Sequence, residues 1–178
     1  MASVNFINMQ ISIATGADIP SLVTLINSAY RGEFSKKGWT TEADLLDGVR
    51  TTEKSLEETM SKPGAVVLIN RNNNGDINAC VYLQKEPGTF YLGMLTVSPL
   101  LQAGGIGGGL LKAAEQHVKK ENGNNITMTV ISVRTELIAW YERHGYKKTG
   151  ETKPFPIDPA FGIPKQTLEF VVMKKMLP

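Results

Sequence analysis

The chain has 178 residues, of which 42% are hydrophobic and 20% charged, and its formal net charge is +2. This length and composition predict one soluble globular domain over residues 1–178, with residues 1–8 as a loose lead-in. The small net charge and the lack of a basic block argue against a nucleic-acid partner, and no apolar run reaches the roughly 18 residues of a membrane-spanning helix.

The single cysteine, Cys80, indicates a reducing compartment because it cannot form an internal disulfide. It lies in an apolar run, where a cysteine behaves as a small hydrophobe rather than as a catalytic thiol. No Lys or Arg precedes Arg31, so we expect no secretory leader. These features predict a cytoplasmic protein, and no His, Cys or Asp cluster has the spacing of a metal site.

The first third of the chain predicts a strand followed by helices. Residues 10–14 alternate between apolar and polar and read as a strand. Asp18 as the N-cap and Pro20 in the first turn predict that a helix begins there. The rest of this third is expected to form a polar loop at residues 31–39 and two short helices, one at 41–46 and one at 53–61.

The middle of the chain predicts a hairpin, because Asn74-Gly75 supplies the positive φ of a tight turn between strands 66–69 and 77–84. A further strand, 90–97, ends before Pro99. A glycine-rich stretch follows. The remaining elements are a helix to residue 121, a strand at 126–133, a helix at 135–144 closed by Gly145, and strands at 146–149 and 167–176 around a Pro-rich loop, 154–164.

The glycine-rich stretch contains five glycines in six positions at the start of a helix. Each costs about 1 kcal/mol relative to Ala inside a helix, which favours a phosphate ligand that needs bare N–H groups over a simple helix-starting turn. Leu110 stands where a Walker A loop needs Lys and where a dinucleotide fingerprint needs Gly. The register Gln102-x-x-Gly105-x-Gly107 instead resembles the acyl-CoA pyrophosphate loop of the GNAT acyltransferase superfamily.

A second motif, RTELIAWYERHGY over residues 134–146, is similar to a GNAT signature, with Tyr141, Gly145 and Tyr146 in register. The order of predicted elements, β-α-α-β-β-β-α-β-α-β-β, is also similar to that family from residue 10 to 176. The resemblance implies an α/β fold (α+β in some schemes) with a mixed, mostly antiparallel central sheet flanked by helices.

The resemblance further implies acetyl-CoA as the acyl donor. The N–H of Val97 would stabilise the developing oxyanion, and Tyr141 would protonate the leaving thiolate. Arg134 stands where many members have Asn. The fork geometry of its guanidinium suits the oxygens of a CoA phosphate, and the alternative is that Arg134 is a solvated charge at the start of the helix. Gly93 marks a candidate bulge or a site of close packing. The expected donor-binding residues are Leu95, Thr96, Val97, Gln102, Ala103, Gly104, Gly105, Ile106, Gly107, Gly108, Arg134 and Tyr141.

The acceptor side is less defined, because the strand before Pro99 lacks the Glu that many members carry there. Glu33 and Glu42 are the leading candidates for the general base, ahead of Asp44. An acceptor pocket containing both would be acidic and would favour a cationic amine. The expected walls of that pocket are Tyr30, Trp39 and Phe155.

The sequence therefore predicts an N-acetyltransferase that acts on a primary amine of a small molecule. A CoA-binding sensor without turnover is the alternative, whereas the failed spacings disfavour a nucleotide-phosphate enzyme. A homodimer is a candidate assembly, since dimers are common in the family.

Overall fold

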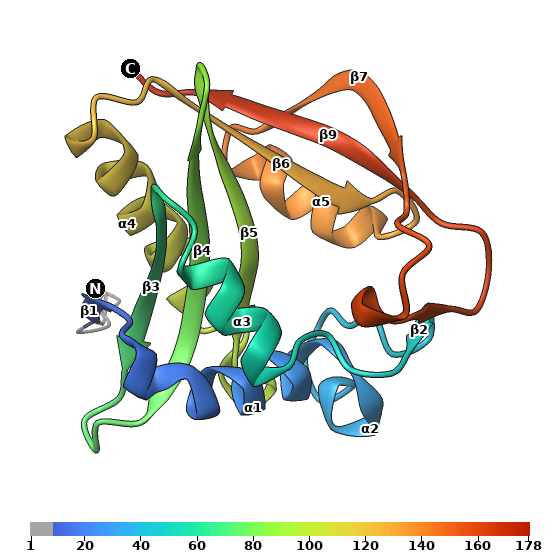
Figure 1. Ribbon diagram of the computed structural model, residues 1–178. Coiled ribbons are helices and arrows are strands. Elements are labelled where there is room, and N and C mark those ends of the chain that lie inside the picture. Colours follow the sequence, from blue (N-terminus) through green and yellow to red (C-terminus); the bar gives the residue numbers. More distant parts are fainter. Residues whose placement is uncertain (1–8) are drawn as a thin grey trace, which may run out of the picture.

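A computed structural model describes residues 9–178; the expectation for residues 1–8 lies outside this range (Figure 1). Among residues 9–178 the main feature is a seven-stranded sheet, in which the only parallel pair described joins β5 to β6. The predicted mixed, mostly antiparallel sheet is thus confirmed. In spatial order the strands are β1 (Gln10–Ile13), β3 (Ala65–Arg71), β4 (Ile77–Glu86), β5 (Thr89–Val97), β6 (Asn125–Ile131), β9 (Glu169–Met176) and β7 (Lys147–Pro154).

Helices cover both faces of this sheet, because the strands alternate their apolar side chains between two cores (Figure 1). Val81 and Leu83 of β4 pack with α4 and α5, whereas Cys80 and Tyr82 pack with α1 and α3. Each face of β4 is therefore buried. The helices are α1 (Ile19–Tyr30), α2 (Gly32–Ser35), α3 (Glu53–Met60), α4 (Ile106–Lys120) and α5 (Thr135–Arg143).

Two local predictions were wrong. Residues 41–46 do not form a helix: Leu45 and Leu46 donate to the carbonyl of Glu42 in a single turn, and the chain then enters the short strand β2 (Leu46–Asp47). This strand pairs with β8 (Ile163–Pro164) of the Pro-rich loop, a tertiary contact that overrides local helix propensity. The segment 31–39, expected as a loop, contains the short helix α2.

The strands β5 and β6 diverge soon after they meet. Their ladder consists of two residue pairs, Phe90–Ile126 and Tyr91–Thr127, whereas β5 continues to pair with β4 as far as Val97. The register of β4 and β5 shifts at this point, and Met94, next to Gly93, has a φ of 49°. The predicted bulge is therefore present, and the far half of β5 has an edge that β6 does not cover.

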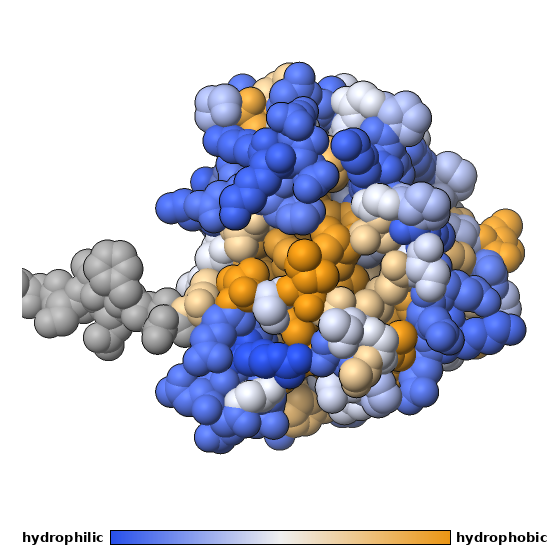
Figure 2. Space-filling model, turned by 60° about the vertical axis from the view of Figure 1, so that its left-hand side comes forward, coloured by the Kyte–Doolittle hydropathy of each residue, from blue (hydrophilic) through white to orange (hydrophobic). Residues whose placement is uncertain are grey.

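The surface and the helix lengths add two observations. On the side of the molecule in Figure 2, hydrophobic residues gather in a central patch bordered above and below by hydrophilic ones. Within residues 9–178, no helix combines the length and the apolar character that a membrane span requires.

We predict that Leu110→Ala lowers the free energy of unfolding by about 2–5 kcal/mol, because Leu110 of α4 is fully buried against the sheet and its truncation leaves a cavity. Urea unfolding measures the change. Leu100→Ala is the matched control, since Leu100 is 66% exposed and its truncation should have little effect. Equal effects of the two substitutions would contradict this packing.

Candidate functional site

Two cavities meet where β5 and β6 diverge. The larger measures about 430 Å³ and the smaller about 240 Å³. Five residues line both cavities, so the cavities are adjacent. The shared residues are Tyr30, Leu95, Arg134, Leu137 and Tyr141.

The glycine-rich loop forms one end of the larger cavity. Ala103 and Gly105 adopt left-handed backbone, with φ of 64° and 88°, and α4 begins directly after Gly105. The first intrahelical bond runs from the N–H of Gly109 to the carbonyl of Gly105, so the N–H groups of residues 106–108 have no acceptor within the helix. A helix N-terminus with free N–H groups and no side chains at 107 and 108 is suited to an anion.

The predicted donor-binding residues of this loop fall into two groups. Gln102, Ala103, Gly105, Gly107 and Gly108 line the larger cavity. Gly104 and Ile106 do not; Gly104 is exposed, and the side chain of Ile106 packs into the core, which leaves only its backbone N–H on the loop side.

Gln102 fastens the loop to its surroundings. Its Nε2 donates to the carbonyl of Val97 (3.2 Å), and its Oε1 accepts from the N–H of Trp39 (3.0 Å). A Cβ on Gly38 would lie 2.2 Å from this Oε1, so a side chain at position 38 would displace the amide of Gln102. The sequence analysis missed Gly38; a glycine next to Trp39 was its only signal.

The uncovered edge of β5 lies between the two cavities. The N–H of Ser98 donates to Asn78 beside β4 (2.8 Å), and strand alternation therefore directs the N–H of Val97 to the opposite side, where β6 has diverged. Val97 and Thr96 line the larger cavity. The carbonyl of Leu95 accepts a hydrogen bond from the hydroxyl of Tyr30 (3.0 Å), which holds the C-terminal end of α1 against this edge.

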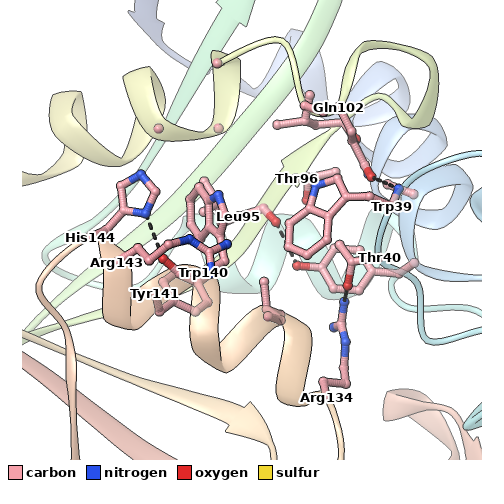
Figure 3. A pocket seen from close by; sticks show the side chains of 18 residues that line it. Trp39, Thr40, Leu95, Thr96, Gln102, Arg134, Trp140, Tyr141, Arg143 and His144 are labelled. Atoms are coloured by element: carbon pink, nitrogen blue, oxygen red, sulfur yellow. Dashed lines mark hydrogen bonds between the residues drawn. The ribbon is translucent and has the colours of Figure 1, made fainter.

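Tyr141 projects from α5 into the junction of the cavities (Figure 3). Its ring packs edge-on against Trp140, with centroids 5.1 Å apart. Burial raises the pKa of the Tyr141 hydroxyl above its ordinary value, so the group stays protonated at neutral pH. Among the hydrogen bonds formed by residues 9–178, none engages this hydroxyl, which leaves its proton available to a bound molecule.

Two basic residues at the end of α5 also line the larger cavity (Figure 3). His144 Nδ1 lies 2.8 Å from the carbonyl of Trp140, and its ring stacks on Trp140. A Cβ on Gly108 would lie 3.2 Å from its Nε2, so the ring abuts the first turn of α4. Arg143 lies beside it. Neither residue was among the predicted site residues.

Glu42, a predicted candidate for the base, is buried between two arginines. Its Oε2 accepts from Arg31 Nη1 and its Oε1 from Arg134 Nη1, the latter at 2.9 Å. All three side chains are less than 10% exposed. A carboxylate whose two oxygens are both bound to guanidinium groups is not arranged to take a proton from an amine.

Arg134 differs from its expected role for the same reason. Its guanidinium donates to Glu42 and, at 2.6 Å, to the hydroxyl of Thr40, instead of facing solvent or a phosphate. It still lines both cavities. A donor phosphate would have to compete with Glu42 for it, so the structure favours Arg134 as a partner of that carboxylate.

The remaining acceptor-side predictions are divided. Tyr30 lines both cavities, Trp39 the larger and Phe155 the smaller. Glu33 lines neither, is largely exposed and pairs with Lys36 (2.9 Å). The expected acidic pocket is therefore wrong: the smaller cavity is bordered by one carboxylate and three guanidinium groups, those of Glu42, Arg31, Arg50 and Arg134.

Comparison with known proteins identifies this architecture. Residues 40–155 match the family model described as "Acetyltransferase (GNAT) domain". The ribosomal-protein-S18-alanine N-acetyltransferase from Escherichia coli is 16% identical, with 95% of this chain and 94% of that chain covered and a TM-score of 0.70. The protein yncA from Salmonella typhimurium, solved with its cofactor acetyl-CoA, is 20% identical, with 96% and 95% covered and a TM-score of 0.69.

A third solved structure, an acetyltransferase of the GNAT family from Staphylococcus aureus Mu50, is 16% identical, with 96% of this chain and 99% of that chain covered and a TM-score of 0.69. At these identities the likenesses show a common fold. Comparison with curated proteins gave no significant match.

We predict that Glu42→Gln lowers the free energy of unfolding by about 3–5 kcal/mol, because it removes the negative charge that two buried guanidinium groups share. Urea unfolding measures the loss. Glu33→Gln, at an exposed ion pair, should change stability little. A Glu42→Gln protein of unchanged stability that has lost turnover would instead support a role for Glu42 as the base.

Proposed function

This chain belongs to the GNAT acetyltransferase family, since the family model covers residues 40–155 of its 178, and we propose that it transfers an acetyl group from acetyl-CoA directly to a primary amine of a small molecule. One observation carries the proposal: the glycine-rich loop, the uncovered edge of β5 and the unengaged hydroxyl of Tyr141 all line one cavity.

The residues present fit acetyl-CoA. The N–H groups at the start of α4 suit the pyrophosphate, because a helix N-terminus favours negative charge and glycine leaves the backbone accessible. The far half of β5, which β6 does not cover, suits the amide-containing pantetheine arm. When bound, acetyl-CoA supplies a thioester whose carbonyl carbon is the electrophile.

Two groups of the chain act on the reacting atoms in this proposal. Val97 directs its N–H into the opening between β5 and β6 and donates it to the acyl oxygen, where negative charge develops. Tyr141 donates its hydroxyl proton to the sulfur as the carbon–sulfur bond breaks and the carbon–nitrogen bond forms. The nitrogen loses its extra proton to solvent as the amide forms, and the Tyr141 hydroxyl regains a proton from solvent.

No residue is assigned as general base. Along the described chain, the only carboxylate on the wall of either cavity is Glu42, which two arginines hold. We therefore propose that the acceptor ammonium loses its proton to solvent before it attacks as the neutral amine. Burial raises the pKa of the Cys80 thiol to about 12, which makes this cysteine unsuited to catalysis.

The remaining sequence predictions, a cytoplasmic location and a homodimer, stay part of the proposal. Neither one enters the mechanism.

We predict that Tyr141→Phe lowers kcat about 10²- to 10⁴-fold and leaves the Kd for CoA unchanged, because the hydroxyl acts on the leaving sulfur rather than on binding. Thiol release from acetyl-CoA with a panel of amines measures turnover, and thermal unfolding with CoA measures binding. The matched control is Tyr82→Phe, since Tyr82 lines neither cavity. Full turnover in Tyr141→Phe would refute the role of Tyr141, whereas CoA binding by wild-type protein without turnover on any amine would indicate a sensor.

The pH dependence provides a second test. We predict that kcat/KM rises roughly tenfold per pH unit and levels off once the acceptor amine is neutral, with no alkaline decline due to Tyr141 up to about pH 10. The sign follows from burial, which disfavours the phenolate and raises the pKa of Tyr141, so the proton remains in place as pH increases. A decline between about pH 8 and about pH 10 that disappears in Tyr141→Phe would contradict this assignment.

A further inference from the structure

The smaller cavity has an excess of positive charge. Three guanidinium groups, from Arg31, Arg50 and Arg134, border it, and Glu42 is the only carboxylate on its wall. Glu42 pairs with Arg31 and Arg134, and Glu136 lies 3.8 Å from Arg134 Nε, so both of these guanidinium groups have a carboxylate beside them. The excess charge of the cavity is therefore that of Arg50.

Arg50 is the guanidinium of this cavity whose charge is uncompensated. Arg31 and Arg134 both pair with Glu42, whereas none of the ion pairs found over residues 9–178 includes Arg50. Its side chain is half-buried and lies over the ring of Tyr30, 5.4 Å from the centroid. A partly buried arginine without a carboxylate beside it is suited to bind an anion from solution.

The position of Arg50 is built into the fold. Asn27 of α1 accepts through its Oδ1 from the N–H groups of Arg50 (2.7 Å) and Thr51 (3.1 Å), and its Nδ2 donates to the carbonyl of Thr51 (2.9 Å). These three bonds clamp the backbone of Arg50 against α1. Because the backbone of Arg50 is held in place, less conformational freedom is lost when its side chain binds a ligand, which lowers the entropic cost of binding.

The same cavity connects Arg50 to the reacting atoms. Tyr30, on which Arg50 lies, donates its hydroxyl to Leu95 on the uncovered edge of β5. Tyr141 borders the cavity at the same junction. A molecule whose anionic group contacts Arg50 thus extends toward the position where the acetyl group would be transferred.

The rest of the wall is mostly apolar. Phe155 and Phe170 pack against each other with ring centroids 5.2 Å apart, and Phe161 lies at the rim. Arg31 Nη2 donates to the carbonyl of Phe161 (3.1 Å), which fastens the Pro-rich loop over this side. With a volume of about 240 Å³, the cavity matches a small molecule with a compact apolar group.

We propose that the acceptor is an amino acid with an apolar side chain, whose carboxylate binds Arg50 and whose side chain packs against Phe155 and Phe170. This inference rests on the proposed acetyl transfer and specifies its acceptor. It reverses the expectation of a cationic substrate, because polyamines would meet three guanidinium groups in this cavity.

Matched acceptors test the proposal in the thiol-release assay with acetyl-CoA. The compounds are leucine and phenylalanine, their carboxamides, their decarboxylated amines, their aminophosphonate analogues and spermidine, each assayed over a pH series so that neutral amine fractions are compared. We expect the free amino acids to exceed the carboxamides in kcat/KM by about 10- to 100-fold, mainly through KM. The assignment of a carboxylate would be overturned if the aminophosphonates equalled the amino acids in kcat/KM. It would also be overturned if the carboxamides, the decarboxylated amines or spermidine did so.

Arg50→Gln should bring the ratio of kcat/KM for amino acid over carboxamide close to 1. Arg71→Gln is the matched control, since Arg71 pairs with Asp18 and lines neither cavity, and it should preserve the ratio. An unchanged ratio in Arg50→Gln would overturn the role of Arg50.

A binding measurement distinguishes failure of this inference from failure of the proposed function. The shift in thermal unfolding of the CoA-saturated protein reports binding of each compound in the panel. If no amine in the panel is acetylated, the proposed function fails; stabilisation by the amino acids over the carboxamides, lost in Arg50→Gln, would still support the site. Acetylation or binding without preference for the carboxylate would overturn the inference alone.

Discussion

The early separation of β5 from β6 is the constraint on which the site depends. After Tyr91 and Thr127 the two strands no longer pair, while β4 keeps β5 in the sheet to Val97. A sheet interior cannot leave backbone polar groups unsatisfied without cost, so the opening must contain side chains, solvent or a ligand. α5 supplies Leu137 and Tyr141 to its walls, and the remaining space joins the two cavities.

The Arg31–Glu42–Arg134 cluster maintains this opening from the other side. It links the end of α1, the turn at residue 42 and the start of α5, three segments that are distant in the chain. Buried ion pairs contribute little net stability, but breaking one is costly, so such a cluster restricts the arrangement of its segments. The N–H of Trp39, close to this cluster in the chain, donates to Gln102 at the start of the glycine-rich loop.

Local patterns predicted most of the fold because they depend on neighbours in the chain. Alternating residues identified β1, the Asn-Gly turn placed the hairpin of β3 and β4, and the glycine register located the start of α4. The failure at residues 41–46 has a different origin. Those residues favour a helix locally, yet two arginines from elsewhere bind Glu42 and β8 pairs with the residues that follow.

By itself, the sequence determined the family, the loop that can bind a phosphate group and the tyrosine of the downstream helix, since each is encoded by residues a few positions apart. Only the tertiary structure decided the charge of the smaller cavity. Residues 31, 42 and 134 meet there, so the carboxylate that suggested an acidic pocket is neutralised. Arg50, unremarkable in the sequence, remains as the free charge because no carboxylate among the described residues pairs with it.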